Sequence, residues 1–292
     1  MANPEDQNTP GADDVSRREF VKASIAAGIA AAAGGAVAAQ QQVTETNVEI
    51  RTPDGTADAA FIHPATGRFP AVLIWPDAFG LRPSMRDMAR RLAAEGYSVL
   101  VPNPFYRVAK SPVFESAANF NFGDPEQRGR LTPLMGSITA DGAAERDAAA
   151  YVAWLDAQPQ IDRTKKIGTQ GYCMGGPLIV RTAAALPDRI GAAASFHGGG
   201  LVTPNPNSPH LLAPKIQARM YFGVAQNDDQ QQPDAKTTLK QAFDAARVPN
   251  EVEVYPAQHG WCVRDMPNGI YSGAEAEKAW GKLLALYRAG LA

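Results

Sequence analysis

The stretch Gly171-Tyr172-Cys173-Met174-Gly175-Gly176 decides the fold of this chain. It follows a short strand pattern at residues 166–170 and precedes a helix pattern that starts near Gly175. A sharp turn from strand to helix exposes its central side chain, and a residue larger than glycine two positions before or after it would collide with the neighbouring elements. The pattern therefore predicts a nucleophile elbow centred on Cys173. The positive end of the helix dipole would favour the thiolate at this position.

Strand and helix patterns alternate on both sides of this turn. Continuous apolar runs at residues 71–75 and 97–101 predict strands that are buried on both faces. Further strands are expected at residues 43–50, 59–62, 192–196, 218–222 and 252–255, and helices at residues 85–94, 140–155, 235–246 and 276–287. Residues 102–133 show little periodicity, so we interpret them as an irregular excursion that covers a pocket. The alternation predicts a single α/β domain over residues 43–292, with a mostly parallel central sheet and helices on both faces.

An acid and a histidine follow the elbow in the order that such a fold requires for catalysis. Asp228 and Asp229 lie in a polar segment after the expected strand at residues 218–222, and either carboxylate is placed to orient a histidine. His259 lies in the loop after the last expected strand, where a catalytic base must sit. The other histidines are His63 before the core of the sheet, His197 after a strand and His210 in a proline-rich loop. For His197, structural hydrogen bonds and a place that lines the cleft are the two alternatives.

Two backbone N–H groups are candidates for holding an oxyanion. One belongs to Met174, directly after the nucleophile, and the other to Ala78 in the loop Trp75-Pro76-Asp77-Ala78-Phe79-Gly80, which follows the first buried strand. Arg107 follows another strand end, where its planar guanidinium can pair with a substrate carboxylate through two parallel hydrogen bonds. The role of a solvated surface arginine fits the sequence equally well.

Charge and composition exclude several classes of protein. The chain has 292 residues, of which 45% are hydrophobic and 20% charged, as in a folded globular protein. The first 39 residues hold three basic and five acidic side chains, which leaves 25 of each sign in the remainder. A neutral domain exerts no overall attraction on nucleic acid or anionic lipid. The sequence also lacks a glycine-rich phosphate loop and a His/Cys cluster with metal-ligand spacing, so we expect no cofactor and no metal.

Residues 1–39 have the pattern of an export signal. The pair Arg17-Arg18 precedes Phe20 and an uncharged run rich in Ala and Gly at residues 23–39. A basic pair, a modestly hydrophobic run and an end of small residues are typical of a twin-arginine signal peptide. The run is too short and too weakly apolar for a stable membrane span. We therefore expect the twin-arginine machinery to export the precursor to the periplasm or the extracellular space.

The chain resembles the dienelactone hydrolase family of α/β-hydrolases over residues 43–292. The resemblance rests on the elbow motif, on Asp228 in its segment after a strand and on His259-Gly260-Trp261, with supporting matches at Phe79-Gly80 and at residues 102–107. It implies an α/β-hydrolase fold and a catalytic triad of Cys173, Asp228 and His259. It also implies a substrate class, the unsaturated lactones that carry a carboxylate.

The resemblance further implies residues that bind substrate. Family members commonly have a glutamate that interacts with the nucleophile, and Asp77, one methylene shorter, stands at that position here. Arg107 matches an arginine that holds the carboxylate of the substrate, and Arg264 is the second candidate for that role. Many members of the family lack an export signal. The signal expected here argues against a role in intracellular aromatic catabolism.

These observations predict a hydrolase that opens a lactone or carboxylic ester through a cysteine thioester, with carboxymethylenebutenolidase activity and a small-molecule substrate. A general exported carboxylesterase is the first alternative. A catalytically silent binding protein of the same fold is the second, and the complete set of nucleophile, acid and base argues against it. Cys262 lies three residues after His259, and a disulfide between Cys262 and Cys173 in an oxidising compartment would switch the enzyme off.

Overall fold

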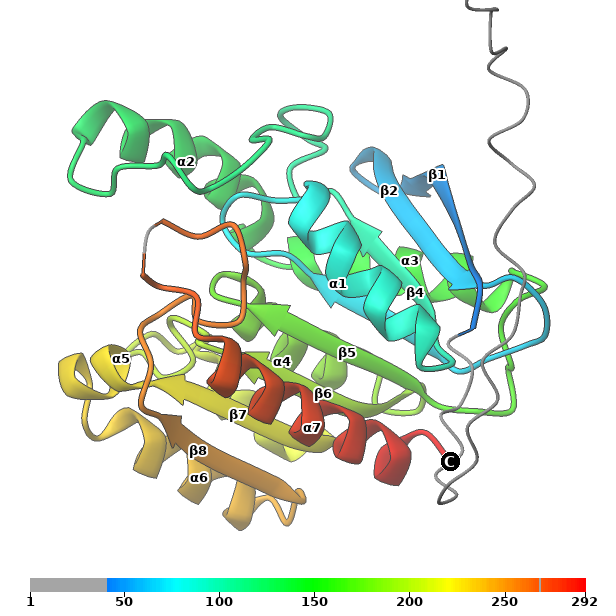
Figure 1. Ribbon diagram of the computed structural model, residues 1–292. Helices are drawn as coiled ribbons and strands as arrows, with labels where there is room; N and C mark the ends of the chain where they lie inside the picture. Colours follow the sequence, from blue (N-terminus) through cyan, green and yellow to red (C-terminus); the bar gives the residue numbers. More distant parts are fainter. Residues whose placement is uncertain (1–40, 268) are drawn as a thin grey trace, which may run out of the picture. The chain divides into compact units, whose positions relative to one another are not determined.

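The computed structural model describes residues 41–267 and 269–292, so the expected export signal at residues 1–39 lies outside the described residues. The strands are β1 (Val43–Thr52), β2 (Gly55–Pro64), β3 (Ala71–Trp75), β4 (Ser98–Pro102), β5 (Ile167–Tyr172), β6 (Ile190–Phe196), β7 (Arg219–Ala225) and β8 (Asn250–Tyr255). They form one sheet in the order β1-β2-β4-β3-β5-β6-β7-β8 (Figure 1). Strand β2 is antiparallel to both of its neighbours, and all other pairs from β4 to β8 are parallel. The carboxyl ends of β5, β7 and β8 therefore lie at one edge of the sheet.

Helices cover both faces of this sheet (Figure 1). They are α1 (Pro83–Ala94), α2 (Pro125–Thr139), α3 (Ala143–Asp156), α4 (Gly175–Ala185), α5 (Gln226–Gln231), α6 (Ala235–Ala245) and α7 (Gly273–Gly290), with a short 3-10 helix η1 (Pro209–Lys215). The buried side chains of α1 and α7 belong to one apolar core, and those of α3, α4 and α6 belong to the other. This arrangement is an α/β-hydrolase fold and confirms the predicted fold class.

Strand β3 shows why the sheet needs two covering layers. All five of its side chains are buried. Successive side chains of a strand point to opposite faces. Accordingly, Ala71, Leu73 and Trp75 enter the core under α3 and α4, while Val72 and Ile74 enter the core under α1 and α7. The continuous apolar run in the sequence is thus explained by burial on both faces.

The segment between β4 and α3 differs from the prediction. We expected an irregular excursion over residues 102–133, but its second half begins helix α2, in which Asp124 caps the first turn by accepting hydrogen bonds from the N–H groups of Glu126 and Gln127. The helix also contains Pro133, which breaks the pattern expected of a helix interior. Only three α2 side chains are buried, namely Leu131, Leu134 and Ile138. The apolar stripe is therefore too sparse to reveal the helix in the sequence.

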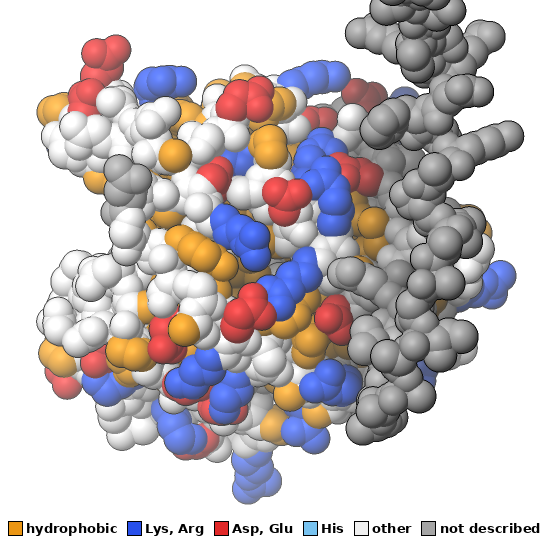
Figure 2. Space-filling view, viewed as in Figure 1, with side chains coloured by type: hydrophobic (Ala, Val, Ile, Leu, Met, Phe, Trp, Pro, Cys, Tyr) orange, Lys and Arg blue, Asp and Glu red, His pale blue; other side chains and the backbone are white. Residues whose placement is uncertain are grey.

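Basic and acidic side chains are interspersed over the described residues on the face shown in Figure 2. This distribution agrees with the equal numbers of the two signs after residue 39. Recognition of a charged ligand therefore has to come from local groups rather than from a field of one sign.

Candidate active site

Cys173 lies on a sharp turn between β5 and α4. Its φ of +51° falls in the left-handed region, which a residue of this type rarely adopts. A Cβ at Gly171 would lie 2.1 Å from the carbonyl oxygen of Gly175, and one at Gly176 would lie 2.4 Å from the Cα of Gly198. Only glycine fits at these positions, which is the reason that the sequence pattern predicts the elbow.

The His259 imidazole hydrogen-bonds to the Asp228 carboxylate. His259 Nδ1 lies 2.7 Å from Asp228 Oδ2, and the backbone N–H of His259 donates to the side-chain oxygen of Asn227 at 2.8 Å. Asp229 turns away and pairs with Lys236 at 2.6 Å. The geometry thus distinguishes two adjacent carboxylates that the sequence left as alternatives. Both lie in the first turn of α5, where we had expected a loop.

The same imidazole also reaches the nucleophile. Burial would lower the pKa of His259, but hydrogen bonds to Asp228 and to Cys173 raise it to about 10. His259 thus hydrogen-bonds to Asp228 and interacts with Cys173, and the three residues follow the carboxyl ends of β8, β7 and β5. This arrangement can move a proton between the thiol and the imidazole while the carboxylate fixes the tautomer of the histidine.

The two candidate oxyanion amides lie on segments that approach each other closely. A Cβ at Gly175 would lie 2.3 Å from the carbonyl oxygen of Trp75, so the start of α4 packs directly against the loop that contains Ala78. Within the described residues, neither the Ala78 N–H nor the Met174 N–H donates a hydrogen bond to a protein acceptor. Both N–H groups, which belong to neighbouring segments of the chain, are therefore free to donate a hydrogen bond to a ligand.

Asp77 is held by a residue that the sequence analysis did not single out. Arg82 Nη1 and Nη2 donate to the two Asp77 carboxylate oxygens at 2.6 and 2.9 Å, and the Phe79 N–H donates to Oδ1 at 2.9 Å. The other edge of the guanidinium pairs with Asp265 at 2.8 and 2.9 Å. Arg82 is 1% exposed. In this structure the carboxylate of Asp77 thus holds a buried arginine, and its interaction with substrate or with the nucleophile stays a prediction.

This buried ion cluster joins three segments of the chain. It links the loop that carries Ala78 to the segment of Asp265, which follows His259, and the Ala117 N–H donates to Asp265 at 3.3 Å. Burial would lower the pKa of Arg82, but the two carboxylates raise it. Sequence reasoning missed the cluster because its partners are separated by as many as 183 positions and no local motif marks them.

Arg107 pairs with two carboxylates of the chain itself. Its Nη1 and Nη2 donate to Asp147 at 2.9 and 2.7 Å, and Nη2 also donates to Asp54 at 2.6 Å. The Asp147 side chain is fully buried and depends on this arginine for compensation of its charge. Both edges of the guanidinium are thus occupied in this structure, and its pairing with a substrate carboxylate stays a prediction.

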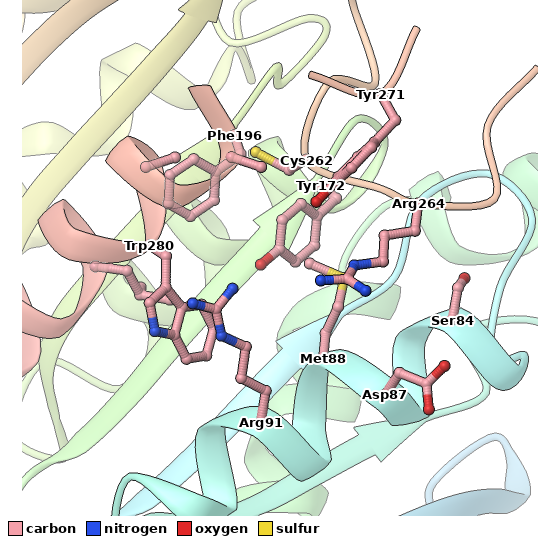
Figure 3. Close-up of a pocket in the computed structure, with 13 residues that line it drawn as sticks. Ser84, Asp87, Met88, Arg91, Tyr172, Phe196, Cys262, Arg264, Tyr271 and Trp280 are labelled. Atoms are coloured by element: carbon pink, nitrogen blue, oxygen red, sulfur yellow. The ribbon is translucent and has the colours of Figure 1, made fainter. Parts of the chain in front are cut away.

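Arg264 lies at a different cavity from the triad. This cavity of about 260 Å³ lies between α1 and α7, and its lining includes Arg264, Arg91, Tyr172, Phe196 and Cys262. Figure 3 shows Arg91 rising from α1 beside Trp280, while Arg264 enters from the loop that precedes α7. Within the described chain, none of Cys173, Asp228 and His259 lines it. The binding of a substrate carboxylate by Arg264 therefore stays a prediction.

Both cysteines are free thiols in the structure. The Cys262 side chain faces the cavity of Figure 3, whereas Cys173 interacts with His259 and does not line that cavity. The expected switch by a disulfide between them thus stays a hypothesis without structural support.

His197 lies beside Cys173 and His259, in agreement with one of the two roles that its place after a strand left open. The Cys173 N–H donates to His197 Nδ1 at 3.1 Å, and the rings of His197 and His259 lie 4.9 Å apart between centroids. The sequence placed His197 after a strand and suggested structural hydrogen bonds. Only its alignment with Cys173 across neighbouring strands β5 and β6 brings it to the site.

Two other kinds of site are not found in the described residues. Residues 41–267 and 269–292 contain no group of three or more His, Cys, Asp or Glu side chains arranged to hold a metal ion. In the same residues, no helix combines the length and apolar composition needed to cross a bilayer.

Comparison with known proteins places this geometry in a family. The model of the dienelactone hydrolase family matches residues 57–290. The chain belongs to the dienelactone hydrolase family. It is 30% identical over 236 residues to a Synechocystis protein named "Putative carboxymethylenebutenolidase", and the match covers 78% of this chain and 89% of that relative. It is 28% identical over 206 residues to the carboxymethylenebutenolidase of a Pseudomonas species, with 70% and 79% covered.

A crystal structure with a similar fold supports the architecture of this dienelactone hydrolase family member. The structure, titled "Putative Dienelactone Hydrolase", comes from Klebsiella pneumoniae and matches with a TM-score of 0.72 and 23% identity. The match covers 85% of this chain and 99% of the other. Together with the family match, this likeness identifies the chain as a hydrolase of the α/β class.

Proposed function

We propose that this dienelactone hydrolase family member opens carboxylic esters or lactones through a thioester on Cys173. The observation that carries the proposal is the 2.7 Å hydrogen bond between His259 and Asp228, together with the interaction of the same imidazole with Cys173 on the elbow. The raised pKa of His259, about 10, means that the imidazole holds a proton at neutral pH beside the thiol sulfur. Such a pair combines a nucleophile with a proton donor for the leaving group.

In the proposed reaction, the Cys173 thiolate attacks the carbonyl carbon and forms a C–S bond. The N–H groups of Ala78 and Met174 donate hydrogen bonds to the carbonyl oxygen and stabilise the negative charge that develops on it. When the tetrahedral intermediate collapses, its C–O bond breaks and His259 gives its proton to the leaving alkoxide. Water then attacks the thioester as His259 takes up one of the water's protons. Cleavage of the C–S bond releases the carboxylic acid and restores the thiolate.

The test is replacement of the proposed nucleophile. The Cys173→Ala variant is expected to lose about a thousand-fold or more in kcat while remaining folded, because no other thiol contacts His259 in the described residues. The Cys262→Ala variant is the matched control and should retain most of its activity. Mass spectrometry of the wild type quenched during turnover should show the acyl group on the peptide that contains Cys173. Turnover by Cys173→Ala at the wild-type rate would remove Cys173 from the mechanism.

Two candidate activities differ in the substrate that each prefers. The names of the relatives favour carboxymethylenebutenolidase activity, which acts on a lactone with a carboxylate. The engagement of Arg107 with Asp54 and Asp147 favours the second candidate, a general carboxylesterase, because this arginine is not open to a substrate carboxylate. Comparing kcat/KM for an acidic lactone, a neutral lactone and an aryl ester decides between them. A preference of a hundred-fold or more for the acidic lactone would reject the esterase.

We also propose that the precursor is exported by the twin-arginine route, on the basis of Arg17-Arg18 and the run that follows. Replacing both arginines by lysine should leave the precursor in the cytoplasm. Normal export of the doubly substituted precursor would show that the signal is not of this type.

A further inference from the structure

His197 directly follows β6 and lies under the active site. It is 1% exposed, and its φ of +43° lies in the left-handed region. Its own N–H donates to the carbonyl oxygen of Gly223 at 2.8 Å, which anchors the residue to the end of β7. Among residues that bear a Cβ, Asn, Asp and His are enriched in this conformation. The side chain is therefore held in a fixed place by its backbone.

The ring of His197 accepts the backbone N–H of the proposed nucleophile. The distance from the Cys173 nitrogen to His197 Nδ1 is 3.1 Å, and the same N–H also lies 3.1 Å from the carbonyl oxygen of Phe196. A ring nitrogen that accepts a hydrogen bond carries no proton, so the proton of the neutral ring is on Nε2. Burial and the positive charge of His259 lower the pKa of His197, which keeps this ring neutral.

The same ring also packs against the proposed base. The centroids of the His197 and His259 rings are 4.9 Å apart with an angle of 60° between the planes, and Trp261 packs on His197 at 5.1 Å. Among the described residues, buried His197 Nε2 has no hydrogen-bond partner. An unpaired buried donor costs free energy of folding. This local cost is of the kind that proteins accept at functional sites.

A neutral acceptor suits this position for an electrostatic reason. A carboxylate would also accept the Cys173 N–H, but it would place a negative charge beside the thiolate. A cationic side chain would repel the protonated His259. Neutral histidine supplies the acceptor without either penalty, and its ring also fills the space next to His259.

We propose that His197 is a positioning residue, whose ring accepts the Cys173 N–H and packs against His259 so that one side chain sets the relative places of nucleophile and base. The proposal rests on the proposed function of Cys173 and His259. It assigns to His197 no contact with substrate. Its effect should appear in the proton transfer step rather than in substrate binding.

Two variants separate the acceptor from the ring. His197→Phe keeps a flat ring and removes the acceptor, whereas His197→Asn keeps an acceptor near the place of Nδ1 and tolerates the left-handed conformation. For His197→Phe, we expect kcat to fall roughly ten-fold, as for the loss of one hydrogen bond, with KM changed by less than about three-fold. His197→Asn should recover most of that loss. His210→Gln, which alters a histidine bonded to Ser208 outside the site, should behave as wild type.

The pH dependence of thiol alkylation tests positioning without turnover. Iodoacetamide reacts with the thiolate, and peptide mass spectrometry reports Cys173 and Cys262 separately. If the elbow loosens, the sulfur loses part of its contact with the protonated His259, so the pH midpoint of Cys173 alkylation should rise by roughly half a unit or more in His197→Phe. The midpoint should return toward that of wild type in His197→Asn.

The outcomes separate this proposal from the proposed function. A wild-type kcat and alkylation profile in His197→Phe would overturn the positioning role, as would a His197→Asn variant no better than His197→Phe. If His197→Phe fails to fold, His197→Ala takes its place as the variant without an acceptor, and equal loss in the Ala and Asn variants overturns the role. If no ester or lactone is hydrolysed by the wild type, the proposed function fails, while the alkylation profiles still decide the role of His197.

Discussion

Two groups of strand ends at the same edge of the sheet differ in how their charged side chains are used. After β5, β7 and β8, His259 hydrogen-bonds to Asp228 and interacts with Cys173, and all three residues remain partly exposed. After β3 and β4, Asp77 and Arg107 bond to oppositely charged groups of the chain itself. A place at the carboxyl end of a strand thus brings a side chain to the region where sites form. Its partners decide whether it is open to substrate.

The contrast also concerns burial. The Arg82 and Asp147 side chains are fully excluded from solvent, so each requires an opposite charge. The Asp228 and His259 side chains are each 28% exposed, and substrate can reach their neighbourhood. The buried pairs of Arg82 and Asp147 hold loops in place, whereas the partly exposed pair of Asp228 and His259 can change its protonation during a reaction.

The largest effect is expected from the carboxylate that contacts His259. Asp228→Asn should lower kcat by about 10⁴-fold, as loss of the orienting acid does in other triads. Asp229→Asn is the matched control, because Asp229 pairs with Lys236 and should leave kcat within a few-fold of wild type. Steady-state kinetics on an aryl ester measures both. The opposite result would assign the orienting role to Asp229.

Breaking the buried cluster should cost stability. Arg82→Met leaves Asp77 and Asp265 without their counter-charge, so we expect the free energy of unfolding to fall by about 3–5 kcal/mol. Lys240→Met removes a pair whose side chains are 50% and 53% exposed and should cost less than about 1 kcal/mol. Urea unfolding followed by circular dichroism compares the two. Equal losses would mean that the cluster is not a special support of the loop.

Arg107→Met tests whether this arginine belongs to the structure or to the substrate site. The substitution leaves the buried Asp147 carboxylate without its counter-charge, so the free energy of unfolding should fall by roughly 1–3 kcal/mol. Combining it with Asp147→Asn should recover part of that loss.

The ratio of kcat/KM for an acidic lactone to that for a neutral ester should stay within about two-fold in the folded Arg107→Met variant. A ten-fold drop in this ratio would instead restore the role that the sequence resemblance implied. Because both substrates are measured on the same variant, a general loss of active protein cancels.

The last expected effect is a dependence of stability on pH. The pKa of His259 is about 10 in the folded chain, above the ordinary value of 6.5. The protonated form therefore stabilises the fold fully below about pH 6.5, and this contribution is lost as the pH rises through about 10. Asp228→Asn removes a hydrogen bond that raises this pKa. Its deficit in unfolding free energy relative to wild type should thus be larger at pH 6 than at pH 10, and a deficit that grows with pH would contradict this linkage.

The sequence alone determined the fold class and the order of the candidate nucleophile, acid and base along the chain. The glycines at positions 171, 175 and 176 are required by contacts as short as 2.1 Å, so their spacing is a direct record of the elbow. Buried strands such as β3 are visible because a strand covered on both faces has no polar positions. Helix α2 was missed because it buries few side chains and contains Pro133.

Only the tertiary structure decided which charged side chains pair with other groups of the chain. The choice between Asp228 and Asp229 depends on the direction of two adjacent side chains. The occupation of Arg107 depends on Asp54 and Asp147, and that of Asp77 on Arg82, which itself bonds to Asp265, 183 positions away. The contact of His197 with Cys173 arises from the parallel pairing of β5 and β6. Local sequence patterns record backbone geometry and burial, whereas ion pairs between distant segments leave no periodic signal and form only when the chain has folded.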